Sequence, residues 1–146
     1  MSTTTRRMQA TPQQVWDVLA DGWLYPLWVV GASRMREVDD HWPTVGSRLH
    51  HSVGTWPMLI DDTTEVVEVV PGSLLVLEAR AWPTGKARVT LRLEAVGAET
   101  DVTIEEDATG GPAVLMPKIA RDPMIGWRNV EAIRRLAYVV ERRRAS

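Results

Sequence analysis

Apolar and polar residues alternate most clearly between residues 86 and 96. In this stretch, KARVTLRLEAV, aliphatic residues occupy every second position, and charged or hydroxyl-bearing residues fill most positions between them. A two-residue period is typical of an antiparallel strand with one buried face. Strand-like runs separated by Pro, Gly and Asp also cover 2–9, 33–39, 47–56, 58–70, 73–82 and 98–108. The chain therefore predicts a meander of about seven strands.

Two short helices are expected after the first strand. The segment TPQQ (11–14) has the form of a capping box with proline at the first helical position. Gly22 ends that helix, and the segment WLYPLWVVG (23–31) looks like a second, short helix broken around Pro26.

A long helix is expected at the other end of the sequence, from Asp122-Pro123 to about Arg143. Its apolar residues recur at helical spacing and form one stripe: Trp127, Val130, Ile133, Leu136, Ala137 and Val140. Strands in series with flanking helices indicate an α+β fold, in which a curved antiparallel sheet covers that stripe.

The composition narrows the classes of partner. A chain of 146 residues is expected to form one domain, 1–146, and its net charge of −2 provides no basic surface for nucleic acid. Cysteine is absent, and arginine outnumbers lysine fifteen to two, which is typical of a GC-rich bacterial genome. The N-terminus lacks a signal peptide's apolar stretch, and no apolar run is long enough to insert into a membrane. We expect a soluble, cytoplasmic protein.

Several segments carry a resemblance to a known superfamily. They are ATPQQVWDVLAD near the N-terminus, YPLW (25–28), VGSRLH (45–50), EVVEVVPGSLLVLEA (65–79) and RNVEAIRRLAYVVERR near the C-terminus. With the order of elements, they resemble the SRPBCC superfamily of START-related, helix-grip proteins, including its polyketide cyclase/dehydrase group. The resemblance implies an elongated apolar cavity between the curved sheet and the C-terminal helix.

The stretch HHSVGTWPMLIDD (50–62) contains two adjacent histidines and two aspartates. Neighbouring strand residues point to opposite faces, so His50 and His51 cannot hold one metal ion together. The parity of Leu49 and Val53 puts His51 on the cavity side, either as a core histidine or as a polar ligand anchor that could move protons. Asp61 and Asp62 are interpreted as a solvated strand opening.

Two further residues could carry chemistry. Glu106 has the same strand parity as Val102 and Ile104, which makes it a candidate cavity acid unless the strand has already ended there. Tyr25 offers a hydroxyl in the second short helix. The candidate catalytic residues are therefore His51, Glu106 and Tyr25, and whether the protein is an enzyme stays open.

The expected ligand-binding set combines these groups with large apolar side chains near element ends and on the last helix: Trp28, His51, Trp56, Met58, Trp82, Glu106, Met116, Trp127 and Ile133. No nucleotide, nucleophile or metal-ligand motif occurs, so we expect no metal and no cofactor. The first hypothesis is binding or transport of a small hydrophobic ligand, such as a lipid, polyketide or aromatic metabolite. The alternatives are a polyketide cyclase/dehydratase and a co-chaperone-like interaction module. The sequence does not distinguish a monomer from a homodimer.

Overall fold

The computed structural model describes residues 2–29, 32–53, 60–81, 85–110 and 118–145. The helical elements are α1 (Pro12–Leu19), the 3-10 turn η1 (Gly22–Leu24), α2 (Tyr25–Trp28) and α3 (Lys118–Ala145). The strands are β1 (Ser2–Met8), β2 (Ala32–Val38), β3 (Arg48–Val53), β4 (Ile60–Val70), β5 (Leu74–Ala81), β6 (Gly85–Val96) and β7 (Glu99–Gly110).

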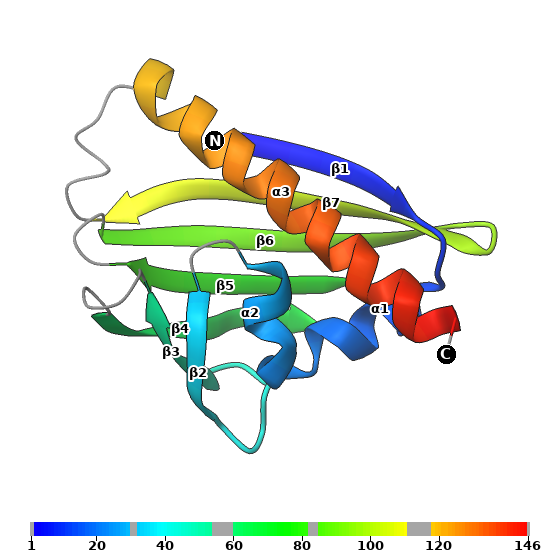
Figure 1. Cartoon of the computed structure of the whole chain (residues 1–146), viewed down its shortest axis with the longest axis horizontal. Helices are drawn as coiled ribbons and strands as arrows, with labels where there is room; N and C mark the ends of the chain where they lie inside the picture. The colour runs from blue at the N-terminus through cyan, green and yellow to red at the C-terminus, as the bar shows by residue number, and fades with distance from the viewer. Residues whose placement is uncertain (1, 30–31, 54–59, 82–84, 111–117, 146) are drawn as a thin grey trace.

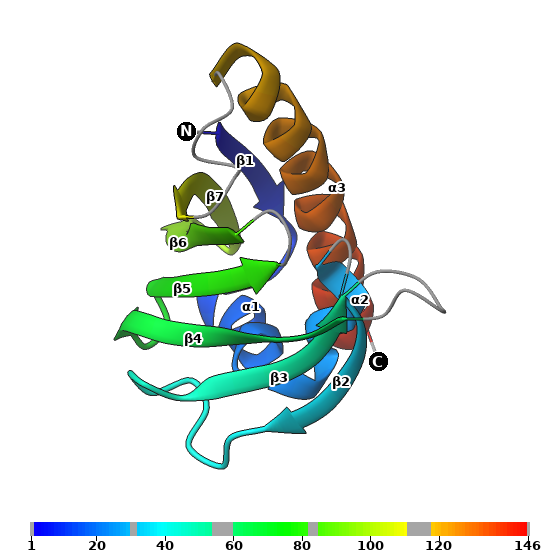
Figure 2. The ribbon, with the colours of Figure 1, turned by 90° about the vertical axis from the view of Figure 1, so that its left-hand side faces the viewer.

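All seven strands form one antiparallel sheet in the order β1-β7-β6-β5-β4-β3-β2. The six strands from β2 to β7 follow one another as a meander, and β1 closes the far side beside β7. The sheet curves, with α1, α2 and α3 on its concave side (Figures 1 and 2). The expected α+β helix-grip architecture is confirmed.

The first helix starts where the capping box predicted it. The backbone N–H of Gln14 donates to Thr11 Oγ1 at 3.2 Å, and the N–H of Thr11 donates to Gln14 Oε1 at 2.9 Å. These two bonds satisfy donors that a helix start otherwise leaves free. Val15, Trp16, Val18 and Leu19 are buried on the inner side of α1.

The last helix is longer than its sequence pattern indicated. It begins at Lys118 instead of Asp122, so Pro123 is its sixth residue. A proline there removes one backbone donor early in the helix and leaves the later turns intact. With 28 residues, α3 is about 42 Å long. It packs against β1, β7, α1 and α2.

The core lies between α3 and the concave face of the sheet. On α3, Ile133, Leu136, Ala137 and Val140 are almost inaccessible to solvent, as their common stripe predicted, but Val130 of the same predicted stripe is 54% exposed. On the sheet, the inward residues of the central strands are buried against them: Leu75, Leu77, Leu91, Leu93, Val102 and Ile104.

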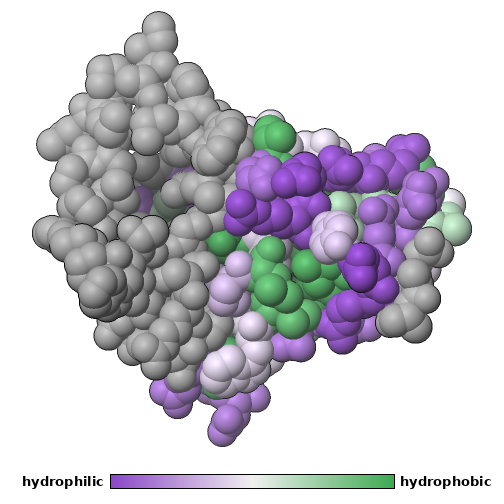
Figure 3. Space-filling model, in the orientation of Figure 1, coloured by the Kyte–Doolittle hydropathy of each residue, from purple (hydrophilic) through white to green (hydrophobic). Residues whose placement is uncertain are grey.

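The short helix α2 has one inward and one outward side. Tyr25 and Trp28 are buried, whereas Leu27 is 55% exposed. In the space-filling view, apolar side chains gather near the middle of the face that includes α2, between hydrophilic groups (Figure 3). The side of α2 that carries Tyr25 and Trp28 therefore packs toward the concave face of the sheet.

Candidate functional site

The concave face of the sheet changes character along the strands. Large aliphatic side chains fill the rows of cross-strand neighbours that include Leu75–Leu91 and Leu77–Val89. The next row toward the end of β5 pairs Ala79 of β5 with Ala87 of β6. Small residues replace large ones here, so this end of the interior has less side-chain volume above the sheet.

These small residues are also incompletely covered. Ala79, Ala87 and Val89 are only half-buried, although they occupy the concave face of central strands. Their neighbours Leu77 and Leu91 are almost completely buried. The helices therefore cover the concave face unevenly and leave it accessible near Ala79 and Ala87.

A buried hydroxyl pair borders this region. The Tyr25 hydroxyl of α2 lies 3.3 Å from Thr64 Oγ1 of β4, and both residues are buried. Thr64 is the cross-strand partner of Ala79, so the pair meets the sheet beside the alanine row. The Tyr25 ring meets the Trp28 ring edge-on, with centroids 5.3 Å apart and planes at 70°. Both rings are buried, so this side of α2 packs into the interior.

Glu106 of β7 is the buried carboxyl of the interior. It is 6% exposed and follows the buried residues Val102 and Ile104 on the same side of the strand. Because β7 continues to Gly110, the strand has not ended at Glu106. Its cross-strand partner on β6 is Val89, one of the half-buried residues. The inward position expected from strand parity is observed, and a role in binding or catalysis stays a prediction.

Asn129 of α3 is a residue that the sequence reasoning missed. It is 3% exposed, and its Nδ2 atom has no hydrogen-bond partner in the part of the chain that the structure describes. The available signal was its spacing: Asn129 lies four residues before Ile133 and seven before Leu136, on the apolar stripe of the helix. Asn129 is thus a polar residue at a position where the helical spacing predicts an apolar one.

Two other buried polar residues serve the fold. Ser47 Oγ donates to the carbonyl of Thr44 at 2.5 Å, and Thr100 Oγ1 donates to the carbonyl of Ala10 at 2.8 Å. The first bond lies within the loop that precedes β3, and the second ties the backbone at Ala10 to β7. Among the buried polar side chains that the structure describes, the other three are therefore the candidates for the interior site: Thr64, Glu106 and Asn129.

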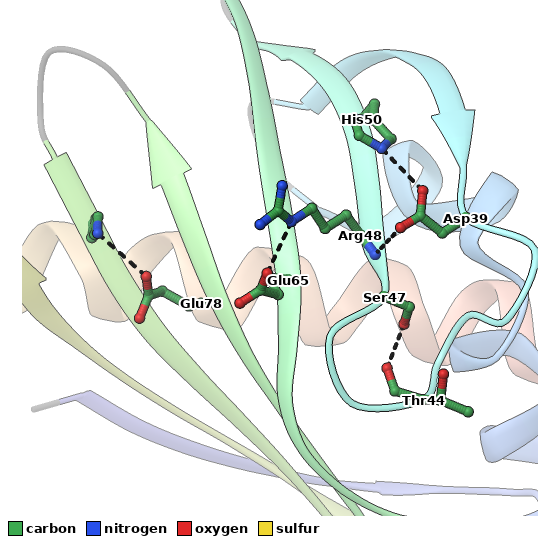
Figure 4. Close-up of polar contacts among 8 residues, drawn as sticks. Asp39, Thr44, Ser47, Arg48, His50, Glu65 and Glu78 are labelled. Atoms are coloured by element: carbon green, nitrogen blue, oxygen red, sulfur yellow. Dashed lines mark hydrogen bonds and ion pairs between the residues drawn. The ribbon is translucent and has the colours of Figure 1, made fainter.

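His50 lies on the outer face of the sheet, as its parity predicted. Its Nε2 is 3.1 Å from Asp39 Oδ1, and the backbone N–H of Arg48 donates to Asp39 Oδ2 at 2.9 Å (Figure 4). The hydrogen bond with His50 is the main cause that lowers the pKa of Asp39, and the bond from the Arg48 backbone adds to it. Burial acts in the opposite direction and raises this pKa. This network joins the start of β3 to the end of β2. Within the described residues, no group of three or more His, Asp or Glu is placed to hold a metal ion.

Most other members of the expected ligand-binding set lie outside the described residues or side chains. Trp28 and Ile133 are buried in the core. The backbone register pairs His51 with Asp62, but its side chain, like that of Trp127, is not described. Trp56, Met58, Trp82 and Met116 lie outside the described residues.

The sequence positions of these last four residues are nevertheless informative. They belong to segments that join Val53 to Ile60, Ala81 to Gly85, and Gly110 to Lys118. The register brings these strand ends to the same end of the sheet, where the alanine row also lies. The connecting segments therefore begin and end near the accessible part of the interior.

Two open depressions lie elsewhere on the surface. One, of about 430 Å³, is lined by residues of α1, η1 and β2 with four carboxylates: Asp17, Asp21, Asp39 and Asp40. The other, of about 410 Å³, lies around Gln9–Thr11 and Glu99. Neither is lined by the interior polar residues. The first is rich in carboxylates, both are open to solvent, and open surfaces are poorly suited to an apolar ligand, so we place the candidate site in the interior.

A family model described as polyketide cyclase/dehydrase and lipid transport matches residues 2–141. The chain belongs to this SRPBCC-type family. No curated protein matches it. The described residues contain no helix that is both long and apolar enough to cross a membrane.

Solved structures share the fold at low identity. A protein of Nitrosomonas europaea is 16% identical, with a TM-score of 0.74 over 99% of this chain and 96% of its own. Ara h 8.0201 is 11% identical, with a TM-score of 0.69 over 94% and 95% of the two chains. DynU16, from the dynemicin biosynthetic locus, is 18% identical, with a TM-score of 0.66 over 96% of this chain and 46% of its own. At these identities the comparisons establish the fold alone.

Proposed function

We propose that the protein binds a small, mostly apolar ligand between the concave face of the sheet and helices α2 and α3. One observation carries this proposal: small, half-buried residues on central strands are bordered by buried polar groups. Ala79 and Ala87 supply the space, and Tyr25, Thr64 and Glu106 supply the polar border. A mostly apolar site with a few convergent polar groups is the usual form of a small-molecule site.

The large side chains expected to line the site extend this proposal. His51, Trp56, Met58, Trp82, Met116 and Trp127 would complete its walls from β3, the connecting segments and α3. A lipid, a polyketide or an aromatic metabolite would fit such walls. The net charge of −2 supports a small-molecule partner over nucleic acid, and we propose a cytoplasmic location.

A polyketide cyclase/dehydratase is the second candidate function. It is supported by the burial of the Glu106 carboxyl and the Tyr25 hydroxyl in one interior, and by the family to which the chain belongs. Both side chains can exchange protons with a bound substrate. A linear polyketide substrate would be held in a folded conformation between the sheet and the helices. Positioning alone would then supply much of the rate enhancement.

Ligand binding can be tested by filling the space above the sheet. Ala87→Leu adds bulk on the concave face of β6, and we expect it to weaken binding of an apolar probe at least tenfold. The probe is ethylnaphthalene, which is titrated into the protein while the change in intrinsic tryptophan fluorescence is followed. Native mass spectrometry of the purified wild-type protein would also detect a ligand that co-purifies.

Ala95→Leu is the matched control, because Ala95 lies on the same strand and is exposed. It should bind the probe as the wild type does. If the wild type binds neither ethylnaphthalene nor other apolar probes, and nothing co-purifies with it, the binding function is wrong. An interaction module would then be the better interpretation.

A further inference from the structure

We propose that Asn129 determines specificity, by donating a hydrogen bond from Nδ2 to a carbonyl oxygen of a neutral, mostly apolar ligand. This inference rests on the proposed binding function and adds the chemical class of the ligand. A buried amide N–H without a partner is destabilising, because it has lost its hydrogen bonds to water and gained none in the protein. Asn129 Nδ2 has no such partner among the residues that the structure describes.

The position of Asn129 connects this donor to the proposed site. It shares the inward stripe of α3 with Ile133, which is 2% exposed, and α3 packs against α2 and β7. Those are the elements that carry Tyr25 and Glu106. The amide is therefore buried in the same interior as the other polar groups, on the helix that covers the sheet.

The chemistry of the amide selects the ligand group. Nδ2 is a donor only, so its partner must be an acceptor, such as a ketone, ester or amide carbonyl. A carboxylate is also an acceptor, but it would bring a negative charge into the interior that holds the Glu106 carboxyl. The buried polar side chains that the structure describes are Ser47, Thr64, Thr100, Glu106 and Asn129, and none is a cation.

An anion placed among these five side chains would gain no countercharge from them and would pay a large desolvation cost. A neutral carbonyl compound gains the hydrogen bond without that cost. The interior should therefore prefer a ketone over both a hydrocarbon of the same ring system and the corresponding carboxylate. Free fatty acids would then be poor ligands, whatever the length of their apolar tails.

Three probes of one ring system test this preference: methyl naphthyl ketone, ethylnaphthalene and naphthoate. Wild-type protein should bind the ketone about fivefold more tightly than ethylnaphthalene, which corresponds to one net hydrogen bond. It should bind naphthoate more weakly than either. Asn129→Leu keeps the volume and removes the donor, so it should bind the ketone and ethylnaphthalene equally.

Stability provides a readout that a purely structural asparagine would not give. Asn129→Leu should unfold at the same temperature as the wild type or higher, because it removes an unpaired buried polar group. Thr100→Val is the matched control. It removes a buried hydroxyl that donates a hydrogen bond to the carbonyl of Ala10, and neither residue belongs to α3. It should lower the unfolding temperature and leave the ketone preference unchanged.

The carbonyl stretch of the bound ketone in wild-type protein gives a measurement that needs no variant. It should lie at lower frequency than in hexane, as a hydrogen-bonded carbonyl does. Equal wild-type affinities for the ketone and ethylnaphthalene, an unshifted carbonyl, or tighter binding of naphthoate would each overturn the assignment. Those results would leave the proposed binding function intact. Failure of the wild type to bind any of the three probes or another apolar probe, with no ligand co-purifying, would instead overturn both.

Discussion

The Tyr25 hydroxyl and Thr64 Oγ1, 39 positions apart in the sequence, lie 3.3 Å apart in the interior of the protein. This contact joins α2 to β4 at the border of the accessible part of the concave face. It places a polar group where the sheet is otherwise lined by small and aliphatic side chains. Its energetic role can be measured separately from any ligand.

Tyr25→Phe should lower the free energy of unfolding by about 1 kcal/mol, the usual net value of a buried hydrogen bond. Urea denaturation followed by tryptophan fluorescence measures it. Tyr138→Phe is the matched control, because Tyr138 is 61% exposed, and it should change stability by less than about 0.5 kcal/mol. Equal stabilities of the wild type and Tyr25→Phe would show that the contact contributes nothing.

Glu106→Gln separates binding from catalysis. The amide has nearly the shape of the carboxyl and keeps an acceptor oxygen, so affinity for methyl naphthyl ketone should stay within about threefold of wild type. Proton transfer needs the carboxyl, so turnover of a linear polyketide thioester should fall at least 100-fold if the protein is a cyclase/dehydratase. Product formation is followed by liquid chromatography.

Glu105→Gln is the control for Glu106→Gln, since Glu105 directly precedes Glu106 on β7 and pairs with Arg92 at 3.4 Å on the outer side. It should affect neither binding nor turnover. Turnover by wild-type protein that survives Glu106→Gln undiminished would remove Glu106 from any catalytic role.

Gly22→Ala should destabilise the fold by about 1–3 kcal/mol, the range for overpacking a filled core. A Cβ at this position would lie 2.5 Å from Leu49 Cδ2 and 2.8 Å from Val38 Cγ1. The glycine thus lets η1 approach the inner side of β2 and β3. Thermal unfolding measures the effect, and an unchanged unfolding temperature would mean that the neighbouring side chains move aside freely.

Glu131 should make stability depend on pH in the acid range. Hydrogen bonds from Arg134, at 2.7 Å and 3.0 Å, and then from Arg135 lower the pKa of Glu131 to about 2. The unfolded value is near 4.3. A carboxyl with a lowered pKa in the folded state stabilises the fold above its unfolded pKa, and the effect is lost as pH falls to about 2.

Glu131→Gln should therefore be less stable than wild type at pH 7, with the difference shrinking between pH 4.3 and about 2. Because these groups lie at the surface, added salt should also reduce the difference. Glu94→Gln, at an exposed position of β6, serves as the comparison. A difference that persists unchanged at pH 2 would contradict the ionic origin of the effect.

Local patterns predicted the elements of this fold well because they depend on neighbours in the sequence. The alternation in 86–96 produced a strand at Gly85–Val96, and the capping box at Thr11 started α1 where expected. Pro123 was wrongly interpreted as the beginning of the last helix. Proline tolerates early helical positions, so it marks a helix start only to within a turn or so.

The sequence by itself determined the order of the strands and helices, the family, and the inward parity of Glu106. The tertiary structure alone decided which distant residues meet: the contact of Tyr25 with Thr64, and the burial of Asn129 with a donor that has no partner among the described residues. Strand parity and helical spacing state which side of an element a residue occupies. Sheet curvature and helix placement decide what that side faces, and these depend on packing across the whole chain.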